Sequence, residues 1–167
     1  YTSRAGVIKL YQSHHPAVEM FYTAETLDNA PAEKRPITFF YNGGPGASSM
    51  LLRIGSFGPK RIEFNPEKKI TAIPVEIKDN PYSLLDKTDM VFIDMPGTGF
   101  GRLTQYGKSF NYYTVDTDAE AFSHFIRKYL SENHRFNSPK FLFGESYGTT
   151  RTAVLIELVQ KFTQVSG

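Results

Sequence analysis

Five residues near the end of the chain have the types and the spacing of a serine nucleophile. Gly144-Glu145-Ser146-Tyr147-Gly148 matches the pattern G-x-S-x-G, in which a serine occupies a sharp turn between a strand and a helix. An apolar run precedes this turn and a segment with helical apolar spacing follows it. A side chain at Gly144 or Gly148 would collide with the neighbouring strand and helix as the backbone reverses. The sequence therefore predicts covalent catalysis by the hydroxyl of Ser146 rather than an ordinary turn serine.

A glycine-rich segment earlier in the chain could supply half of an oxyanion hole. Asn42-Gly43-Gly44-Pro45-Gly46 follows the apolar run Ile37 to Tyr41. Acyl transfer needs two backbone N–H groups at the developing oxyanion. Tyr147 would supply one, and Gly43 or Gly44 the other, since a missing side chain lets the backbone approach the substrate carbonyl. Alone this segment is equally well explained as a turn, but together with the serine motif it indicates an oxyanion loop.

The elements that would position these residues alternate between strands and helices. We expect an N-terminal antiparallel pair, Gly6 to Tyr11 and Ala17 to Thr26, joined by a turn at Gln12 to Pro16. Buried strands are expected at Ile37 to Tyr41, Met90 to Asp94 and Lys140 to Phe143, and helices at Ser48 to Ile54, Asp116 to Asn133 and Thr149 to Phe162. Thr117 and Glu120 have the spacing of a capping box in the second helix. The alternation predicts an α/β fold with a mostly parallel sheet and flanking helices.

Three blocks of residues, in this order and at these intervals, resemble the serine carboxypeptidases, a peptidase S10-like family of the α/β-hydrolase superfamily. The blocks are Asn42 to Ser49, Asp94 with Pro96 to Phe100, and Gly144 to Gly148, and Asn80 to Ser83 adds a further matching segment. The resemblance runs from about Met20 to the end of the chain. It implies an α/β-hydrolase fold and an exopeptidase that releases C-terminal residues from peptides through an acyl-enzyme on Ser146.

The resemblance also implies a role for each site residue. Gly44 and Tyr147 would donate the oxyanion N–H groups, and Asn42, Gly43 and Glu145 would bind the substrate. Asn42 and Glu145 would recognise its terminal carboxylate, with Glu145 protonated because two adjacent negative charges repel. A preference for acidic conditions follows, and the alternative for Glu145 is a structural residue of the turn.

Two positions depart from the pattern of the family. Ala47 stands where many members have a cysteine of a disulfide, and Ser56 stands where many have a second glutamate. The chain thus lacks two features that are common around the carboxylate site of the family.

The residues that would complete a catalytic triad do not follow the nucleophile. In α/β-hydrolases the order is Ser, then an acid, then His, whereas Glu157 is the only acid after Ser146 and no histidine follows it. The four histidines, His14, His15, His124 and His134, are expected at the surface. We therefore expect residues 1–167 to be the N-terminal part of a single α/β-hydrolase domain, with the Asp and the His in the missing C-terminal part. Such a chain should be inactive alone and should expose apolar surface where further strands would pack.

Composition restricts the other partners that the chain could have. Its 19 Lys and Arg and 17 Asp and Glu are interspersed, which favours neither nucleic acid nor a membrane surface as a partner. Cysteines are absent, metal-ligand spacing is absent, and the glycine-rich segments match neither nucleotide-binding pattern, so neither a metal nor a cofactor is expected. The expected partner is a peptide with a free C-terminal carboxylate. The resemblance alone weakly favours a periplasmic or secreted protein.

Two alternatives remain open at the level of sequence. The same fold could host an esterase, an acyltransferase or a proline iminopeptidase, although the glycine loop of iminopeptidases usually follows His rather than Asn. A non-catalytic scaffold built from a degenerate hydrolase is the other alternative. The intact Ser146 and both glycine-rich segments argue against it.

Overall fold

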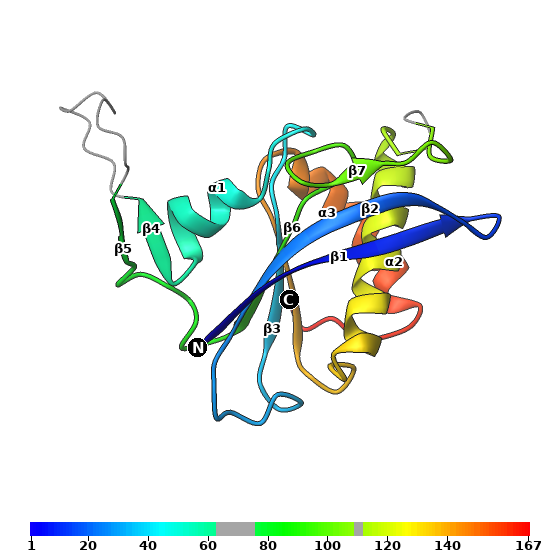
Figure 1. Cartoon of the computed structure of the whole chain (residues 1–167). Helices are drawn as coiled ribbons and strands as arrows, with labels where there is room; N and C mark the ends of the chain where they lie inside the picture. Colours follow the sequence, from blue (N-terminus) through cyan, green and yellow to red (C-terminus); the bar gives the residue numbers. More distant parts are fainter. Residues whose placement is uncertain (63–75, 109–111) are drawn as a thin grey trace.

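The computed structural model describes residues 1–62, 76–108 and 112–167 (Figure 1). Its main sheet has six strands in the order β1-β2-β6-β3-β8, with β7 beside β2. The strands are β1 (Thr2–Gln12), β2 (His15–Thr26), β3 (Ile37–Tyr41), β6 (Asp89–Ile93), β7 (Arg102–Leu103) and β8 (Lys140–Gly144). β6, β3 and β8 run parallel, whereas β1, β2 and β7 pair antiparallel. The expected α/β fold is confirmed, and its parallel part consists of the three strands that lead to the predicted site.

Helical segments lie on both sides of this sheet (Figure 1). α2 (Val115–Glu132) and α3 (Tyr147–Gln160) cover one face. The short helix α1 (Met50–Leu52) and the π-helical turn η1 (Arg53–Phe57) lie by the other face, together with the small sheet of β4 (Lys60–Ile62) and β5 (Ile77–Asp79). No helix within the described ranges is long and apolar enough to cross a membrane.

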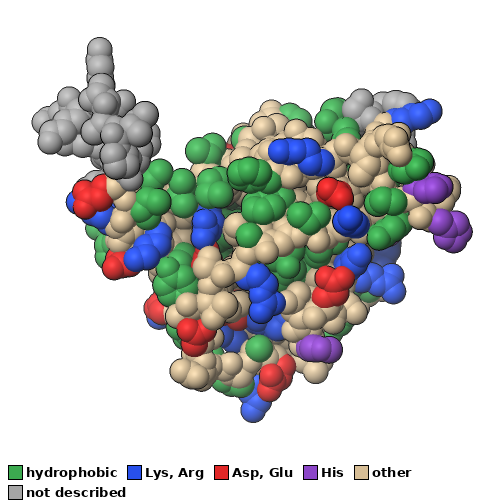
Figure 2. Space-filling view, viewed as in Figure 1, with side chains coloured by type: hydrophobic (Ala, Val, Ile, Leu, Met, Phe, Trp, Pro, Cys, Tyr) green, Lys and Arg blue, Asp and Glu red, His purple; other side chains and the backbone are tan. Residues whose placement is uncertain are grey.

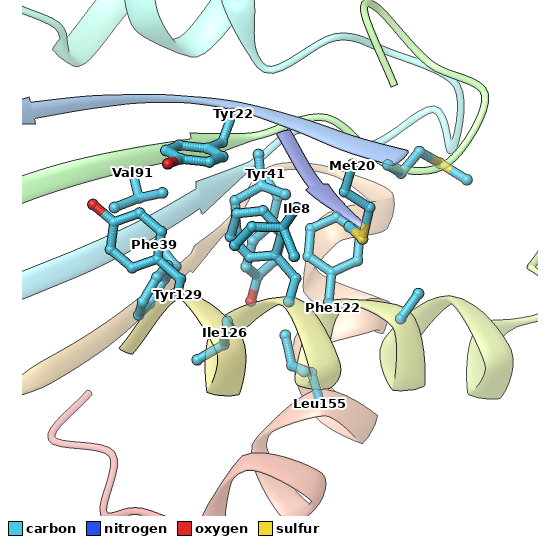
Figure 3. Close-up of a cluster of buried hydrophobic side chains, with 14 of the residues drawn as sticks. Ile8, Met20, Tyr22, Phe39, Tyr41, Val91, Phe122, Ile126, Tyr129 and Leu155 are labelled. Atoms are coloured by element: carbon cyan, nitrogen blue, oxygen red, sulfur yellow. The ribbon is translucent and has the colours of Figure 1, made fainter. Parts of the chain in front are cut away.

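The core explains why the central strands are apolar on both faces. Successive side chains of a strand point to opposite faces, so Phe39 and Tyr41 of β3 point towards α2 and α3. Figure 3 shows this layer, in which Phe122 and Leu155 reach the strands from the two helices. Phe40 points the other way and stacks on Phe92 at 4.9 Å between ring centroids. All five residues of β3 are buried in consequence, as is typical of a central parallel strand.

The N-terminal hairpin is longer and its turn is tighter than the sequence predicts. The turn consists of Ser13 and His14 instead of the expected Gln12 to Pro16, and both have positive φ, at 47° and 71°. Two successive residues with positive φ match the right-handed twist of the flanking strands. The hairpin therefore extends by pairing Gln12 with His15.

Two expectations about helices are wrong in detail. The capping box of α2 uses Thr114 and Thr117, not Thr117 and Glu120, because Thr114 is extended and its side chain accepts from the N–H of Thr117. The helix expected at Ser48 to Ile54 is divided into α1 and η1.

Candidate active site

The predicted sharp turn lies between β8 and α3. Ser146 occupies it with φ 53° and ψ −120°, a conformation that is strained for a residue with a side chain. The N–H of Glu145 donates to the carbonyl of Tyr41 at 3.1 Å, which ties the turn to the end of β3. The N–H of Gly148 donates back to the carbonyl of Glu145 at 2.7 Å. The backbone therefore holds Ser146 exposed at the carboxyl end of the parallel strands.

The two glycines of the motif are required for the steric reason that the sequence suggests. A Cβ on Gly144 would overlap the carbonyl group of Gly148 and lie 2.7 Å from Oγ1 of Thr152. A Cβ on Gly148 would lie 3.0 Å from the carbonyl oxygen of Tyr41. Strand, turn and helix can therefore pack this closely only with glycine at Gly144, and most readily with glycine at Gly148.

The glycine-rich loop after β3 lies directly against this turn. A Cβ on Gly43 would lie 2.6 Å from the backbone nitrogen of Tyr147, 2.7 Å from the carbonyl oxygen of Glu145 and 2.9 Å from Cβ of Ser146. β3 and β8 are parallel neighbours, so their carboxyl ends meet at one edge of the sheet. The two segments that the sequence predicts as halves of an oxyanion hole are thus in contact.

The hydrogen bonds of the loop distinguish its two candidate donors. The N–H of Gly43 donates to Oδ1 of Asn42 at 2.9 Å and is buried. Gly44 has φ +105° and is exposed. Within the described part of the chain, the N–H groups of Gly44 and Tyr147 have no acceptor. Gly44 rather than Gly43 therefore presents a free N–H beside Tyr147.

Asn42 and Glu145 differ in how much of each side chain is free. Asn42 is buried; besides accepting from Gly43, its amide donates to the carbonyl of Ser48 at 3.3 Å. One amide hydrogen of Asn42 is left for another acceptor. Glu145 is exposed and its carboxylate forms no hydrogen bond or ion pair with the rest of the described structure. Asn42 thus shapes the loop, while Glu145 is free to meet a ligand.

Asp94, which follows β6, binds the segment that follows the glycine-rich loop. Its Oδ1 accepts from Oγ of Ser48 at 3.0 Å and from the N–H of Ser49 at 2.8 Å, and its Oδ2 accepts from the N–H of Phe100 at 3.2 Å. The sequence gives Asp94 a place in the family pattern but no role. The structure shows that it joins the segment after the glycine-rich loop to the loop after β6.

A buried ion pair that the sequence analysis does not identify lies beside the same loop. Nε of Arg151 in α3 lies 2.8 Å from Oδ2 of Asp118 in α2, and both side chains are almost fully buried. Arg151 also donates through Nη1 to the carbonyl of Asn42 at 2.9 Å. Burial raises the pKa of Asp118, and the charge and hydrogen bond of Arg151 oppose that rise.

A base for Ser146 is not found among the described residues. His14 and His15 lie at the hairpin turn, His124 is exposed on α2, and His134 is exposed just beyond α2. Within the ranges described, the Ser146 hydroxyl has no hydrogen-bond partner, and no cluster of three His, Asp or Glu could hold a metal. Ser146 therefore lacks the partner that would activate it here.

Comparison with known proteins gives the family. A family model described as serine carboxypeptidase matches residues 3–165. "Serine carboxypeptidase-like 21" of Arabidopsis thaliana is 32% identical over 130 residues, which cover 76% of this chain and 24% of that protein. "Pheromone-processing carboxypeptidase KEX1" of Debaryomyces hansenii is 33% identical over 148 residues, which cover 86% of this chain and 19% of that protein. The chain spans about a quarter or less of the length of these relatives.

Solved structures give the fold. The peroxisomal α/β-hydrolase Lpx1 of Saccharomyces cerevisiae has a TM-score of 0.56 at 10% identity, covering 97% of this chain and 41% of its own. A proline iminopeptidase of Mycobacterium smegmatis has a TM-score of 0.51 at 12% identity, covering 93% of this chain and 39% of its own. With the family match and the strained serine turn between β8 and α3, these likenesses lead to one conclusion: the chain belongs to the serine carboxypeptidase family and has part of the α/β-hydrolase fold.

Proposed function

We propose that this chain is the nucleophile-bearing part of a serine carboxypeptidase, which releases C-terminal residues from peptides through an acyl-enzyme on Ser146. The observation that supports the proposal is the close approach of Gly43 to Tyr147 and Ser146, with Gly44, whose N–H has no acceptor among the described residues, next along the chain and with Ser146 exposed and strained. Two converging N–H groups beside a serine hydroxyl are what stabilises the tetrahedral intermediate of acyl transfer.

The chemistry divides between these residues and a base that lies elsewhere. Oγ of Ser146 would attack the scissile carbonyl, and the N–H groups of Gly44 and Tyr147 would hold the oxygen that becomes negative. A histidine would take the serine proton and pass it to the departing amino acid, and water would then hydrolyse the acyl-enzyme. We propose that sequence outside these 167 residues supplies this histidine and the acid that orients it. The lack of a partner for Ser146 and the greater length of the relatives support this.

Glu145 and Asn42 would make the enzyme an exopeptidase. Glu145 is adjacent to Ser146 and exposed, and Asn42 has one amide hydrogen free. Together they would bind the terminal carboxylate of the substrate, Asn42 by its amide and Glu145 by its side chain. A free-acid peptide would then gain charge-assisted hydrogen bonds that a C-terminal amide does not form.

Replacement of the nucleophile tests the proposal. In the full-length enzyme Ser146→Ala should lower kcat by about 10⁴- to 10⁶-fold, because only the oxyanion hole and substrate binding would remain. A fluorophosphonate probe should label Ser146 in the wild type. Ser131→Ala, an exposed serine on α2, is the matched control and should leave kcat unchanged. Labelling of another residue would contradict the assignment.

A pair of substrates tests exopeptidase specificity. The enzyme should cleave a free-acid peptide far faster than its C-terminal amide, because only the free acid gains charge-assisted hydrogen bonds. Glu145→Gln keeps a hydrogen-bond donor at this position, so it should retain the preference for the free acid. Equal kcat/KM for both peptides would indicate an endopeptidase or an esterase instead.

The 167-residue chain should show no turnover by itself. Its Ser146 lacks a base among the described residues, and a serine hydroxyl without a base is a weak nucleophile. The measurement is hydrolysis of a blocked dipeptide by the purified chain. If the chain hydrolyses the dipeptide and Ser146→Ala abolishes this activity, the base lies within the chain and this part of the proposal is wrong.

A further inference from the structure

The Arg151 side chain connects the segments that form the candidate oxyanion hole. Its Nε is paired with Asp118 of α2 at 2.8 Å, and its Nη1 donates to the carbonyl of Asn42 at 2.9 Å. Its Nη2 lies 3.7 Å from the sulfur of Met95, in the loop after β6. One guanidinium group thus contacts α2, the loop after β3 and the loop after β6, while its own backbone belongs to α3.

The aromatic rings around Arg151 extend this connection to the second donor. The guanidinium carbon lies 5.3 Å from the ring centroid of Tyr147, whose N–H is the other half of the hole. It lies 4.3 Å from the ring centroid of Phe122 and 5.4 Å from that of Tyr41. Figure 3 shows Tyr41 and Phe122 within the layer between β3 and α2. A guanidinium stacked on rings has few alternative positions.

The bond to Asn42 acts close to the proposed oxyanion donor. The Asn42 carbonyl belongs to the peptide unit whose nitrogen is that of Gly43, and that N–H donates to Oδ1 of Asn42. The next N–H along the chain is the free one of Gly44. Fixing the Asn42–Gly43 peptide at both ends therefore restricts where the N–H of Gly44, one peptide further along, can lie.

Stability alone does not explain why the pair is present. Replacing a buried ion pair by apolar residues of similar volume is often neutral or stabilising, because both charges must be desolvated. Here Arg151 is 0% exposed, Asp118 is 1% exposed, and Oδ1 of Asp118 has no hydrogen-bond partner in the described structure. A core that needed only packing would be served as well by two apolar side chains.

We propose that Arg151, held in place by Asp118, is a positioning residue that sets the Asn42–Gly43 peptide and Tyr147 relative to each other and so aligns the two N–H groups of the oxyanion hole. Arg151 itself does not touch the substrate. The inference rests on the proposed acyl-transfer function of Ser146, Gly44 and Tyr147.

The decisive variant replaces both charges at once in the full-length enzyme. Arg151→Met with Asp118→Leu replaces both charges by apolar side chains and leaves no buried charge unpaired. We expect its Tm to stay close to that of the wild type while kcat falls roughly 10- to 100-fold and KM changes less than about threefold, because a misaligned donor is lost only from the transition state. Arg151→Lys keeps the charge, but a single ammonium group cannot replace the planar guanidinium that binds Asp118 and the Asn42 carbonyl together. Its kcat should therefore also be lower than that of the wild type.

A matched control lies at the other end of the sheet. Arg135 is also buried and pairs with a buried aspartate, Asp89, at 2.7 Å. Arg135→Lys should lower Tm and leave kcat unchanged at a temperature where the protein is folded. Equal losses of kcat in Arg135→Lys and Arg151→Lys would mean that any buried pair matters only through stability, and would overturn the inference.

Amide hydrogen exchange at Gly43 separates this inference from the proposed function. The N–H of Gly43 is hydrogen-bonded in the intact loop, so its exchange should accelerate in the double variant if Arg151 holds the loop. Unchanged kcat in the double variant overturns the inference whatever the exchange rate. If the wild type and Ser146→Ala have the same turnover, the proposed function fails, and kcat can no longer test the inference. The exchange rate of the Gly43 N–H in the double variant then tests the positioning role by itself, and an unchanged rate overturns it.

Discussion

The two ends of the parallel strands both bury arginine and aspartate, but they pair them differently. At the amino end, both oxygens of Asp89, the first residue of β6, are satisfied. Oδ1 accepts from Nε of Arg35 at 2.6 Å and from the N–H of Leu27 at 3.1 Å, and Oδ2 accepts from Nη1 of Arg135 at 2.7 Å. The remaining donors of Arg135 bind Oγ of Ser138 at 2.7 Å and the carbonyl of Arg35 at 3.0 Å. Asp89, Arg35 and Arg135 thus form a closed network.

The carboxyl end leaves polar groups open. Oδ1 of Asp118 has no partner and the N–H groups of Gly44 and Tyr147 have no acceptor within the described residues. Ser146, with φ 53° and ψ −120°, lies at this end as well. Ligands of open α/β sheets bind at the carboxyl ends of the strands. The comparison indicates that the Asp89 network is fully paired, whereas the Asp118–Arg151 pair and the N–H groups of Gly44 and Tyr147 leave polar atoms unpaired among the described residues.

The face seen in Figure 2 does not show this difference, because charges of both signs are interspersed over it. Large apolar side chains are also exposed, among them Phe143 of β8 at 36% and Phe100 at 60%. Phe143 lies on the strand at the end of the described sheet order, where the sequence analysis expects apolar surface to be uncovered. The difference between the two ends therefore has to be tested by substitution.

The largest expected effect comes from the oxyanion loop. Gly43→Ala would place a Cβ 2.6 Å from the nitrogen of Tyr147 and separate the two halves of the hole, so kcat of the full-length enzyme should fall by about 10²- to 10³-fold. Gly46→Ala is a control in the same loop, because a Cβ there meets nothing within 4 Å. Steady-state kinetics of both variants makes the measurement. Similar losses in the two would show that the contact between loop and turn is not needed.

Breaking the closed network should affect stability and spare activity. Asp89→Asn removes the charge that the buried Arg135 and the partly buried Arg35 share, so the free energy of unfolding should fall by about 3 to 5 kcal/mol. Urea denaturation measures it, and kcat below the transition should be unchanged. Asp86→Asn, an exposed aspartate beside Lys87, is the control and should leave stability unchanged. A drop in kcat for Asp89→Asn in the folded protein would erase the distinction between the two ends.

The smallest expected effect concerns the buried tyrosines near each end of the parallel strands and the pH dependence of stability that they cause. Burial raises the pKa of Tyr41 to about 12, so the folded chain keeps this proton while the unfolded chain loses it from about pH 10. Stability should fall as pH rises between these values. Tyr41→Phe should make that fall shallower by up to about 1.4 kcal/mol per pH unit in urea denaturation.

A second tyrosine provides the comparison at the amino end. Burial also raises the pKa of Tyr129, which lines a pocket there with Asp89 and Arg135. Tyr129→Phe should also make the fall in stability with pH shallower, because burial raises the pKa of both tyrosines. A change in slope at one tyrosine alone would mean that burial, not pairing, separates the two ends.

Local patterns were enough to predict the elements that lead to the site. The turn around Ser146 could be read from sequence because its demands are local: an apolar strand, two glycines without room for a side chain, and a helix. β3 and β6 could be predicted because strands buried on both faces are continuously apolar. The capping box was assigned three residues too late, since Thr114, Thr117 and Glu120 repeat the same spacing and the sequence does not show which threonine is extended.

Pairing across the fold could not be predicted in the same way. Whether Gly43 or Gly44 offers a free N–H depends on which one the Asn42 side chain occupies, and that is a property of the folded loop. Arg151 and Asp118 do carry a signal, because each interrupts an apolar stripe at helical spacing, four residues before Leu155 and Phe122 respectively. Such charges on buried faces predict an ion pair, but not its partner.

The position of β3 in the sheet has a consequence for the order of folding. Its neighbours come from distant parts of the chain, because Ile37 pairs with both Asp89 and Lys140. The β1–β2 hairpin, by contrast, closes around Ser13 and His14 and needs no distant segment. Closing a long loop costs more entropy than closing a short one and slows the formation of the contacts that it brings together. We therefore expect the hairpin to form early and the serine turn to meet the glycine loop late, so that the catalytic geometry appears only when the long-range contacts of the sheet are complete.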